Sequence, residues 1–126
     1  MDNMNKTKMK KKFVIGSANF VQKYGADQKK ISHKEIKKIL SLAKENSIHK
    51  IDTAEAYIKN KDIFKKIDKK FQFISKIKPD YKWISLDYCK KKLKGHFNKF
   101  NKNKIETLLF HDDKILLKKE GPSIFK

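Results

Sequence analysis

Arginine is absent from this sequence, and glycine, proline and cysteine are scarce. All 33 basic side chains are lysines, against 14 acidic ones, so the net charge is +19 at pH 7. Lysine neutralises phosphates without reading base sequence, whereas bidentate recognition of guanine is chiefly a role of arginine. The composition therefore argues against specific recognition of nucleic acid and leaves non-specific attraction to polyanions open. The excess of Lys, Ile, Asn and Phe over Gly and Pro also matches what an AT-rich gene would encode.

The single cysteine, Cys89, excludes an internal disulfide framework and is typical of a reducing compartment. No apolar run approaches the roughly 20 residues that a membrane-spanning helix needs. The apolar stretch that follows the lysine-rich residues 1–12 is short, and Gly16 and Ser17 interrupt it, unlike the core of a signal peptide. We therefore expect a cytoplasmic protein without a membrane partner, in which residues 1–12 form a lysine-rich tail.

Short β-branched or aromatic runs alternate along the chain with segments whose apolar residues recur at helical spacing. Ser32 and Glu35 have the spacing of a capping box at the start of the first such helix. The expected elements are strands at 13–15, 48–51, 71–76 and 107–110, helices at 32–43, 57–67 and 84–97, and a helical fragment at 115–117.

This alternation favours an α/β fold with parallel strands joined by right-handed crossover helices. Such a sheet is normally covered on both faces or closed into a barrel. Four units of this kind can begin either a doubly wound sheet or a (β/α)8 barrel. The glycine-rich turn of a dinucleotide-binding sheet is absent after the first strand, where residues 16–19 read Gly-Ser-Ala-Asn.

Four side chains with acid–base or hydrogen-bonding chemistry lie at the ends of the expected strands. Asp52 ends the second strand, Tyr57 lies just beyond it, Lys76 ends the third strand, and His111 follows the fourth. In a parallel barrel these positions converge on the carboxyl-end rim, where enzymes of this fold keep their chemistry. A lysine ammonium beside a phenol favours phenolate, so the group could supply a proton to the alkoxide that forms when hydride reaches a carbonyl carbon.

The same segments resemble the N-terminal half of an aldo-keto reductase. The resemblance rests on Ile15–Phe20 with Tyr24-Gly25, on the signature Asp52-Thr-Ala-Glu-Ala-Tyr57, on the lysine strand at 74–77, and on the histidine strand at 108–112. It covers nearly the whole chain after residue 12. It implies that residues 13–126 form a truncated (β/α)8 TIM barrel, made of roughly its first four β/α units.

The resemblance also implies roles for the four strand-end residues. Tyr57 would be the general acid and base, with Lys76 as the cation beside its phenol. Asp52 would anchor the lysine, and His111 would orient the carbonyl group of the substrate. The implied reaction transfers hydride between NADP(H) and a small carbonyl or alcohol substrate.

The implied cofactor contacts in this chain are few. Gly16, Ser17 and Asp52 would touch the nicotinamide end of NADP(H), and the main phosphate and adenine contacts would fall in the second half of the barrel. A complete barrel has about 250 residues, so we expect this chain alone to be inactive and to bind NADP(H) weakly. A half-barrel exposes two strand edges, so we also expect a complementary C-terminal half or self-association.

Two local departures from the family pattern stand out. After Tyr57 the family usually continues with Gly-x-Ser-Glu, whereas residues 58–61 here read Ile-Lys-Asn-Lys. The helix before the aspartate strand often ends in Asn-Gly, whereas this chain has Asn46-Ser47. If that position requires a positive φ, Ser47 carries a strain that glycine would avoid.

Each candidate also has a purely structural interpretation. Asp52 could cap a helix, as aspartate often does at a strand-to-helix turn. Tyr57 could be a core aromatic with its hydroxyl at the rim. Lys76 is one lysine among many, and His111 with the two aspartates that follow it could form a cap or a metal-like cluster that arose by chance.

The remaining histidines, His33, His49 and His96, show no ligand spacing, so we expect no metal site. Two functional alternatives stay open beside the reductase. One is a non-catalytic remnant of such an enzyme, and the other is a lysine-rich module that binds polyanions through charge alone.

Overall fold

The computed structural model describes residues 13–26, 28–59, 61–78, 85–98 and 105–119, together with Phe100 and Pro122. The expected tail at 1–12 lies outside the described residues. The elements in chain order are β1 (Ile15–Gly16), α2 (Ala18–Val21), α3 (His33–Glu45), β2 (Lys50–Asp52), η1 (Glu55–Lys59), α4 (Lys61–Lys65), β3 (Gln72–Ile77), α5 (Leu86–Phe97), β4 (Ile105–Phe110) and η2 (Asp113–Leu117), where η marks a 3₁₀ helix.

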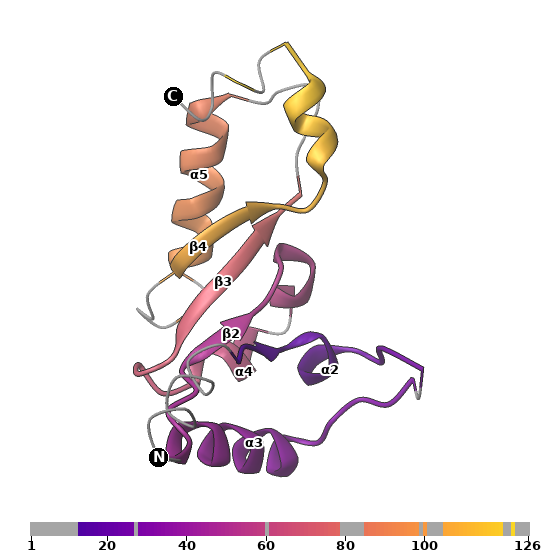
Figure 1. The fold of residues 1–126 in the computed structure, drawn as a ribbon, viewed down its shortest axis with the longest axis vertical. Helices are drawn as coiled ribbons and strands as arrows, with labels where there is room; N and C mark the ends of the chain where they lie inside the picture. The colour runs from indigo at the N-terminus through magenta and orange to yellow at the C-terminus, as the bar shows by residue number, and fades with distance from the viewer. Residues whose placement is uncertain are drawn as a thin grey trace, which may run out of the picture.

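The sheet of the described residues has four strands in the order β1-β2-β3-β4, and every neighbouring pair is parallel. It runs through the middle of the molecule, with α3 near one end and α5 near the other (Figure 1). Parallel strands in chain order confirm the predicted α/β architecture of repeated β/α units. The one irregularity in register is a bulge opposite Phe73 and Ile74, which places Glu106 between two paired residues of β4.

The capping box at the start of α3 is confirmed. The Ser32 side chain accepts a hydrogen bond from the backbone N–H of Glu35, and the Glu35 carboxylate accepts one from the backbone N–H of Ser32. The same helix ends at Glu45, and two residues later Ser47 has a φ of +59°. The sequence comparison with Asn-Gly therefore identified a position that does require the left-handed conformation.

The prediction of a single helix at 57–67 is wrong, because two separate elements occupy this segment. A 3₁₀ turn, η1, begins at Glu55, and a separate short helix, α4, follows from Lys61 to Lys65. The backbone N–H of Tyr57 donates to the carbonyl of Ala54, an i→i−3 bond that tightens the first turn. The first strand spans Ile15–Gly16 rather than 13–15, so it begins two residues later and ends one residue later than expected.

One face of the sheet packs against α3 and α4. Phe64 of α4, Phe73 of β3 and Phe100 are fully buried, and their rings pack edge-to-face or stacked with centroids 4.4–6.0 Å apart. Ile51 of β2 and Ala43 of α3 join the same cluster. This aromatic cluster fixes the helices against the sheet, because such pairs add to the stabilisation from burial itself.

The opposite face, which we call the open face, carries the alternate residues of the same strands. Asp52 on β2 and Ile74 and Lys76 on β3 are only partly buried there. Lys50 of β2 pairs with Glu106 of β4 across this face at 2.9 Å. The open face is therefore more polar and more exposed than the face covered by α3 and α4. None of the helices in the described residues has the length and apolar character needed to cross a bilayer.

Candidate functional site

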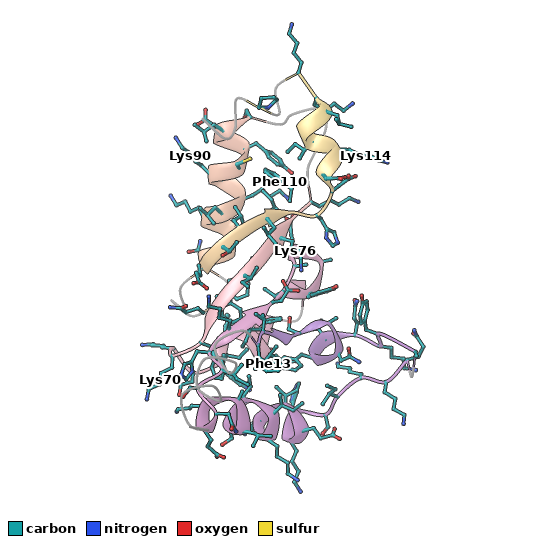
Figure 2. All side chains as sticks on the ribbon, viewed as in Figure 1. Phe13, Lys70, Lys76, Lys90, Phe110 and Lys114 are labelled. Carbon is teal, nitrogen blue, oxygen red and sulfur yellow. The ribbon has the colours of Figure 1, made fainter. Side chains whose placement is uncertain are left out.

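The strand-end residues of the sequence analysis lie at one edge of the sheet. Because all four strands are parallel, the last residues of β2, β3 and β4 share their carboxyl edge. Asp52 ends β2, Lys76 is the penultimate residue of β3, and His111 directly follows β4. Figure 2 shows Lys76 and Lys70 toward opposite ends of β3. Tyr57 lies in η1, the turn that leaves the carboxyl end of β2.

Asp52 and Lys76 form a close side-chain contact at this edge. The Lys76 ammonium donates to both carboxylate oxygens of Asp52, at 2.7 Å to Oδ1 and 2.6 Å to Oδ2. Both side chains are partly buried, with 36% and 26% of their surface exposed. The pair forms because Asp52 lies opposite Ile74 on the adjacent strand, and Lys76 lies two residues further along the same face.

This contact bears on the structural interpretation of Asp52 as a helix cap. The backbone carbonyl of Asp52 accepts from the N–H of Ser17, and its carboxylate engages Lys76 rather than a helix N-terminus. Among the described residues the Asp52 carboxylate therefore pairs with Lys76 and does not cap η1, and its role as the anchor of a catalytic lysine stays a prediction.

Tyr57 follows Asp52 by five residues and precedes Lys76 in the chain, and among the described residues it forms no bond to either side chain. Its ring packs against the aromatic cluster under the sheet, as its structural interpretation anticipated. Within the part of the chain that the structure describes, the Tyr57 hydroxyl takes part in no hydrogen bond. The Tyr57 phenol therefore lies in the turn at the same edge as Lys76, but no hydrogen bond connects the two side chains.

His111 continues the ladder between β3 and β4 through its backbone. Its N–H donates to the carbonyl of Ile77 at 2.9 Å, and its side chain is exposed. The cap function proposed for this segment belongs to Asp112, whose side chain accepts from the N–H of Lys114 at the start of η2. The His111 ring is therefore left at the carboxyl edge, and it forms no hydrogen bond among the described residues.

The three positions expected to contact a nicotinamide differ in how well they fit that group. Gly16 is exposed, and a Cβ added there would meet no atom within 4 Å, so the chain is open to approach beside β1. Ser17 is 1% exposed, so it is closed off from any ligand, and its hydroxyl has no hydrogen-bond partner among the described residues. Asp52 is accessible but is engaged by Lys76. The described residues therefore fit the approach of a ring at Gly16 and not a complete dinucleotide site.

A second charged cluster at this edge was missed in the sequence. The Glu55 carboxylate of η1 accepts from the Lys92 ammonium of α5 at 2.6 Å and from the backbone N–H of Lys78 at 3.2 Å. The Lys92 ammonium also lies 5.6 Å from the centroid of the Tyr88 ring. The hydrogen bond to Glu55 raises the pKa of Lys92 above its usual value. Glu55 thereby ties the turn that carries Tyr57 to the end of β3 and to α5.

Comparisons with protein-family models, with curated proteins and with solved structures find no match to this chain. Within the described ranges, no group of three or more His, Cys, Asp or Glu side chains is arranged to hold a metal ion. Cys89, a free and buried thiol in α5, has a pKa raised by that burial and so remains protonated and inert.

Proposed function

We propose that this chain supplies the acid–base residues of an NADP(H)-dependent aldo-keto reductase, which transfers hydride between the cofactor and a carbonyl or alcohol substrate. The observation that carries the proposal is the bidentate Asp52–Lys76 pair at the carboxyl edge of a parallel sheet, with Tyr57 in the turn that follows Asp52. Carboxyl edges are where parallel α/β enzymes assemble their active sites.

Each of the four residues has a distinct role in this proposal. Tyr57 gives a proton to the carbonyl oxygen in reduction and removes it in oxidation. Lys76 favours the phenolate form of Tyr57, and Asp52 holds the ammonium in place. His111 hydrogen-bonds the carbonyl oxygen. Hydrogen bonds of this kind often tighten only when the substrate is bound, so the separation of Tyr57 from Lys76 is compatible with these roles.

The proposal assigns the hydride to NADP(H), whose nicotinamide would lie over Gly16. It also assigns the remaining barrel strands, which bind the rest of the cofactor, to a complementary C-terminal half. The open face supports this assignment, because parallel sheets are normally covered on both faces. The chain alone would associate with itself through that face, in the cytoplasm, and would lack activity.

The test is complementation with a polypeptide that carries the last four β/α units of a bacterial aldo-keto reductase. We expect NADPH-dependent reduction of an aromatic aldehyde only in the mixture. Tyr57→Phe should lower its rate about 10²–10⁴-fold, because it keeps the ring and removes the proton. Tyr24→Phe is the matched control, since Tyr24 is exposed and distant in sequence. A mixture in which Tyr57→Phe reduces the aldehyde at the parental rate contradicts the proposal.

The net charge of +19 favours one second candidate, a module that binds polyanions by charge. This candidate predicts retention on RNA that disappears with rising salt and does not change in Tyr57→Phe or Lys76→Met. A complemented mixture that shows neither reduction nor such retention would instead identify a non-catalytic remnant.

A further inference from the structure

A cleft of about 160 Å³ lies between α3 and α4, and none of the candidate site residues lines it. Its floor is apolar and comes from both helices and the residues just after α4. Three of the four floor side chains are only 3–8% exposed, and the fourth is half-buried. The floor residues are Ile36, Leu40, Ile63 and Ile67.

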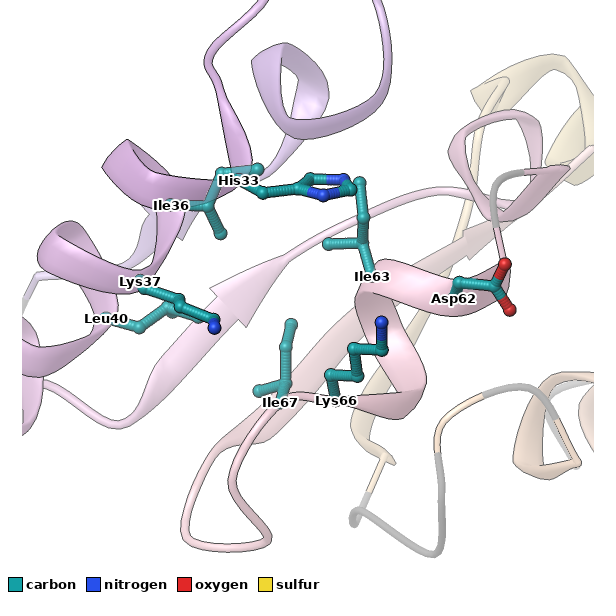
Figure 3. A pocket seen from close by; sticks show the side chains of 8 residues that line it. All are labelled: His33, Ile36, Lys37, Leu40, Asp62, Ile63, Lys66 and Ile67. Atoms are coloured by element: carbon teal, nitrogen blue, oxygen red, sulfur yellow. The ribbon is translucent and has the colours of Figure 1, made fainter.

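Two lysines flank the opening of this cleft. Lys37 extends from α3 and Lys66 from the end of α4, and in Figure 3 their ammonium groups approach from opposite sides. Neither lysine takes part in an ion pair or a side-chain hydrogen bond within the described residues. Asp62 is the acidic residue of the lining, and its carboxylate points away from both ammonium groups (Figure 3).

The size of the cleft limits what it can hold. An enclosed apolar cavity of about 150 Å³ accepts one benzene ring, and this cleft has a similar volume with one side open to solvent. The ring of His33 closes one end beside Ile63 (Figure 3). A ring on the isoleucine floor would bury apolar surface, and a charged group at its edge would lie between Lys37 and Lys66.

We propose that this cleft is a binding site for a small aromatic carboxylate. The single ring lies on the floor formed by Ile36, Ile63 and Ile67, and the carboxylate lies between the ammonium groups of Lys37 and Lys66. A lysine acts as a point charge without a fixed fork geometry, so the two cations select the ligand by charge while the floor selects for the ring. The site is independent of the proposed reductase activity.

The test is an NMR titration of the full chain at low salt, with sodium benzoate as the probe. Nine heavy atoms of ordinary ligand efficiency correspond to a Kd on the order of 1–10 mM. We expect saturable shifts of the backbone amides of α3 and α4. Benzyl alcohol has the ring without the charge, and acetate has the charge without the ring. Each should bind at least about fivefold more weakly than benzoate.

Two double variants distinguish binding of benzoate in the cleft from its general attraction to a positively charged surface. Lys37→Gln/Lys66→Gln should weaken benzoate about fivefold and leave benzyl alcohol unchanged. Lys38→Gln/Lys65→Gln removes the same charge from the same two helices outside the cleft, and it should leave benzoate affinity within about twofold. The proposal is overturned if benzoate gives no saturable shift, if acetate binds as tightly, or if the two double variants weaken benzoate equally.

Discussion

The two faces of the sheet are built by opposite means, although the same strands supply both. On the covered face, Ile51, Phe73 and Ile77 are completely buried. On the open face, the neighbouring residues Asp52, Ile74 and Lys76 keep part of their surface in solvent. Apolar packing dominates the covered face. The open face carries ion pairs between adjacent and next-adjacent strands.

This difference shows where stability and chemistry reside in the chain. Apolar burial stabilises in proportion to the area removed from water, whereas a partly exposed ion pair is screened and contributes little. The open face can therefore carry charged residues in defined positions at small cost to the fold. Its Asp52–Lys76 pair lies at the edge where the proposed reaction takes place.

Removal of an aromatic ring from the covered face should cause the largest loss of stability. Phe73→Ala should lower the free energy of unfolding by about 3–5 kcal/mol, because it leaves a cavity against Phe64 and Phe100. Ile74→Ala, one residue along on the open face, should cost about 1 kcal/mol or less. Urea unfolding of both variants checks this, and equal losses would show that the open face is packed after all.

The ion pairs of the open face give a smaller expected effect. Asp52→Asn should cost at most about 1 kcal/mol of stability, since the Lys76 and Asp52 side chains are 26% and 36% exposed. Glu106→Gln, which breaks the pair with Lys50, should cost a similar amount. Unfolding is measured at low and high salt, and the difference in stability between each variant and the parent should shrink as the salt concentration rises. A loss of several kcal/mol in Asp52→Asn would mean that the pair behaves as a buried one.

In the turn after α3, a single substitution should raise the stability of the protein. Ser47→Gly should raise the free energy of unfolding by about 0.5–1 kcal/mol, because glycine adopts the φ of +59° without strain. Ser41→Gly makes the same exchange inside α3 and should lower stability by about 1 kcal/mol. Thermal unfolding of the two variants should therefore move in opposite directions, and a shift of the same sign in both would contradict the strain at Ser47.

The smallest effect concerns the pH dependence of the capping box. The hydrogen bond from the Ser32 hydroxyl, at 2.6 Å, and the Ser32 backbone N–H hold the pKa of Glu35 below its ordinary value of 4.5. A lowered folded-state pKa adds stability that is fully present above pH 4.5 and is lost as the pH falls through the lower folded value.

Glu35→Gln separates charge from hydrogen bonding at this cap, because glutamine can also complete a capping box. The variant should be slightly less stable than the parent at neutral pH, because it lacks the stabilised carboxylate, and it should lose less stability on acidification. Urea unfolding above and below pH 4.5 measures the difference. If the variant loses as much stability on acidification as the parent, the pH dependence arises at another residue. Asp68 is one example, since its pKa is lowered chiefly by its hydrogen bond from Lys44.

Local patterns made much of the fold predictable. The spacing of Ser32 and Glu35 identified the start of α3, and the alternation around Phe73 identified β3. The order of strands and helices then implied parallel pairing, which placed Asp52 and Lys76 at one edge. These inferences succeeded because each depends on neighbours in the chain or on a general rule of topology.

The parts that could not be predicted depend on contacts between distant segments. Glu55 pairs with Lys92, 37 residues away, only because α5 lies beside the end of β3. In a chain with 33 lysines, sequence alone does not select a partner for any acid. The division of the expected helix at 57–67 has the same origin, since Glu55 anchors η1 to Lys78 and Lys92 before α4 begins.

The central claim is that Lys76 acts on the reaction through Tyr57, and a double-mutant cycle in the complemented enzyme tests it most directly. Tyr57→Phe, Lys76→Met and the double variant are compared by the rate of aldehyde reduction under single-turnover conditions. Residues that act as a unit give strongly non-additive losses. The account predicts that Lys76→Met is severe in the parent and costs less than about threefold once Tyr57 is phenylalanine. Losses that simply multiply in the double variant would contradict it.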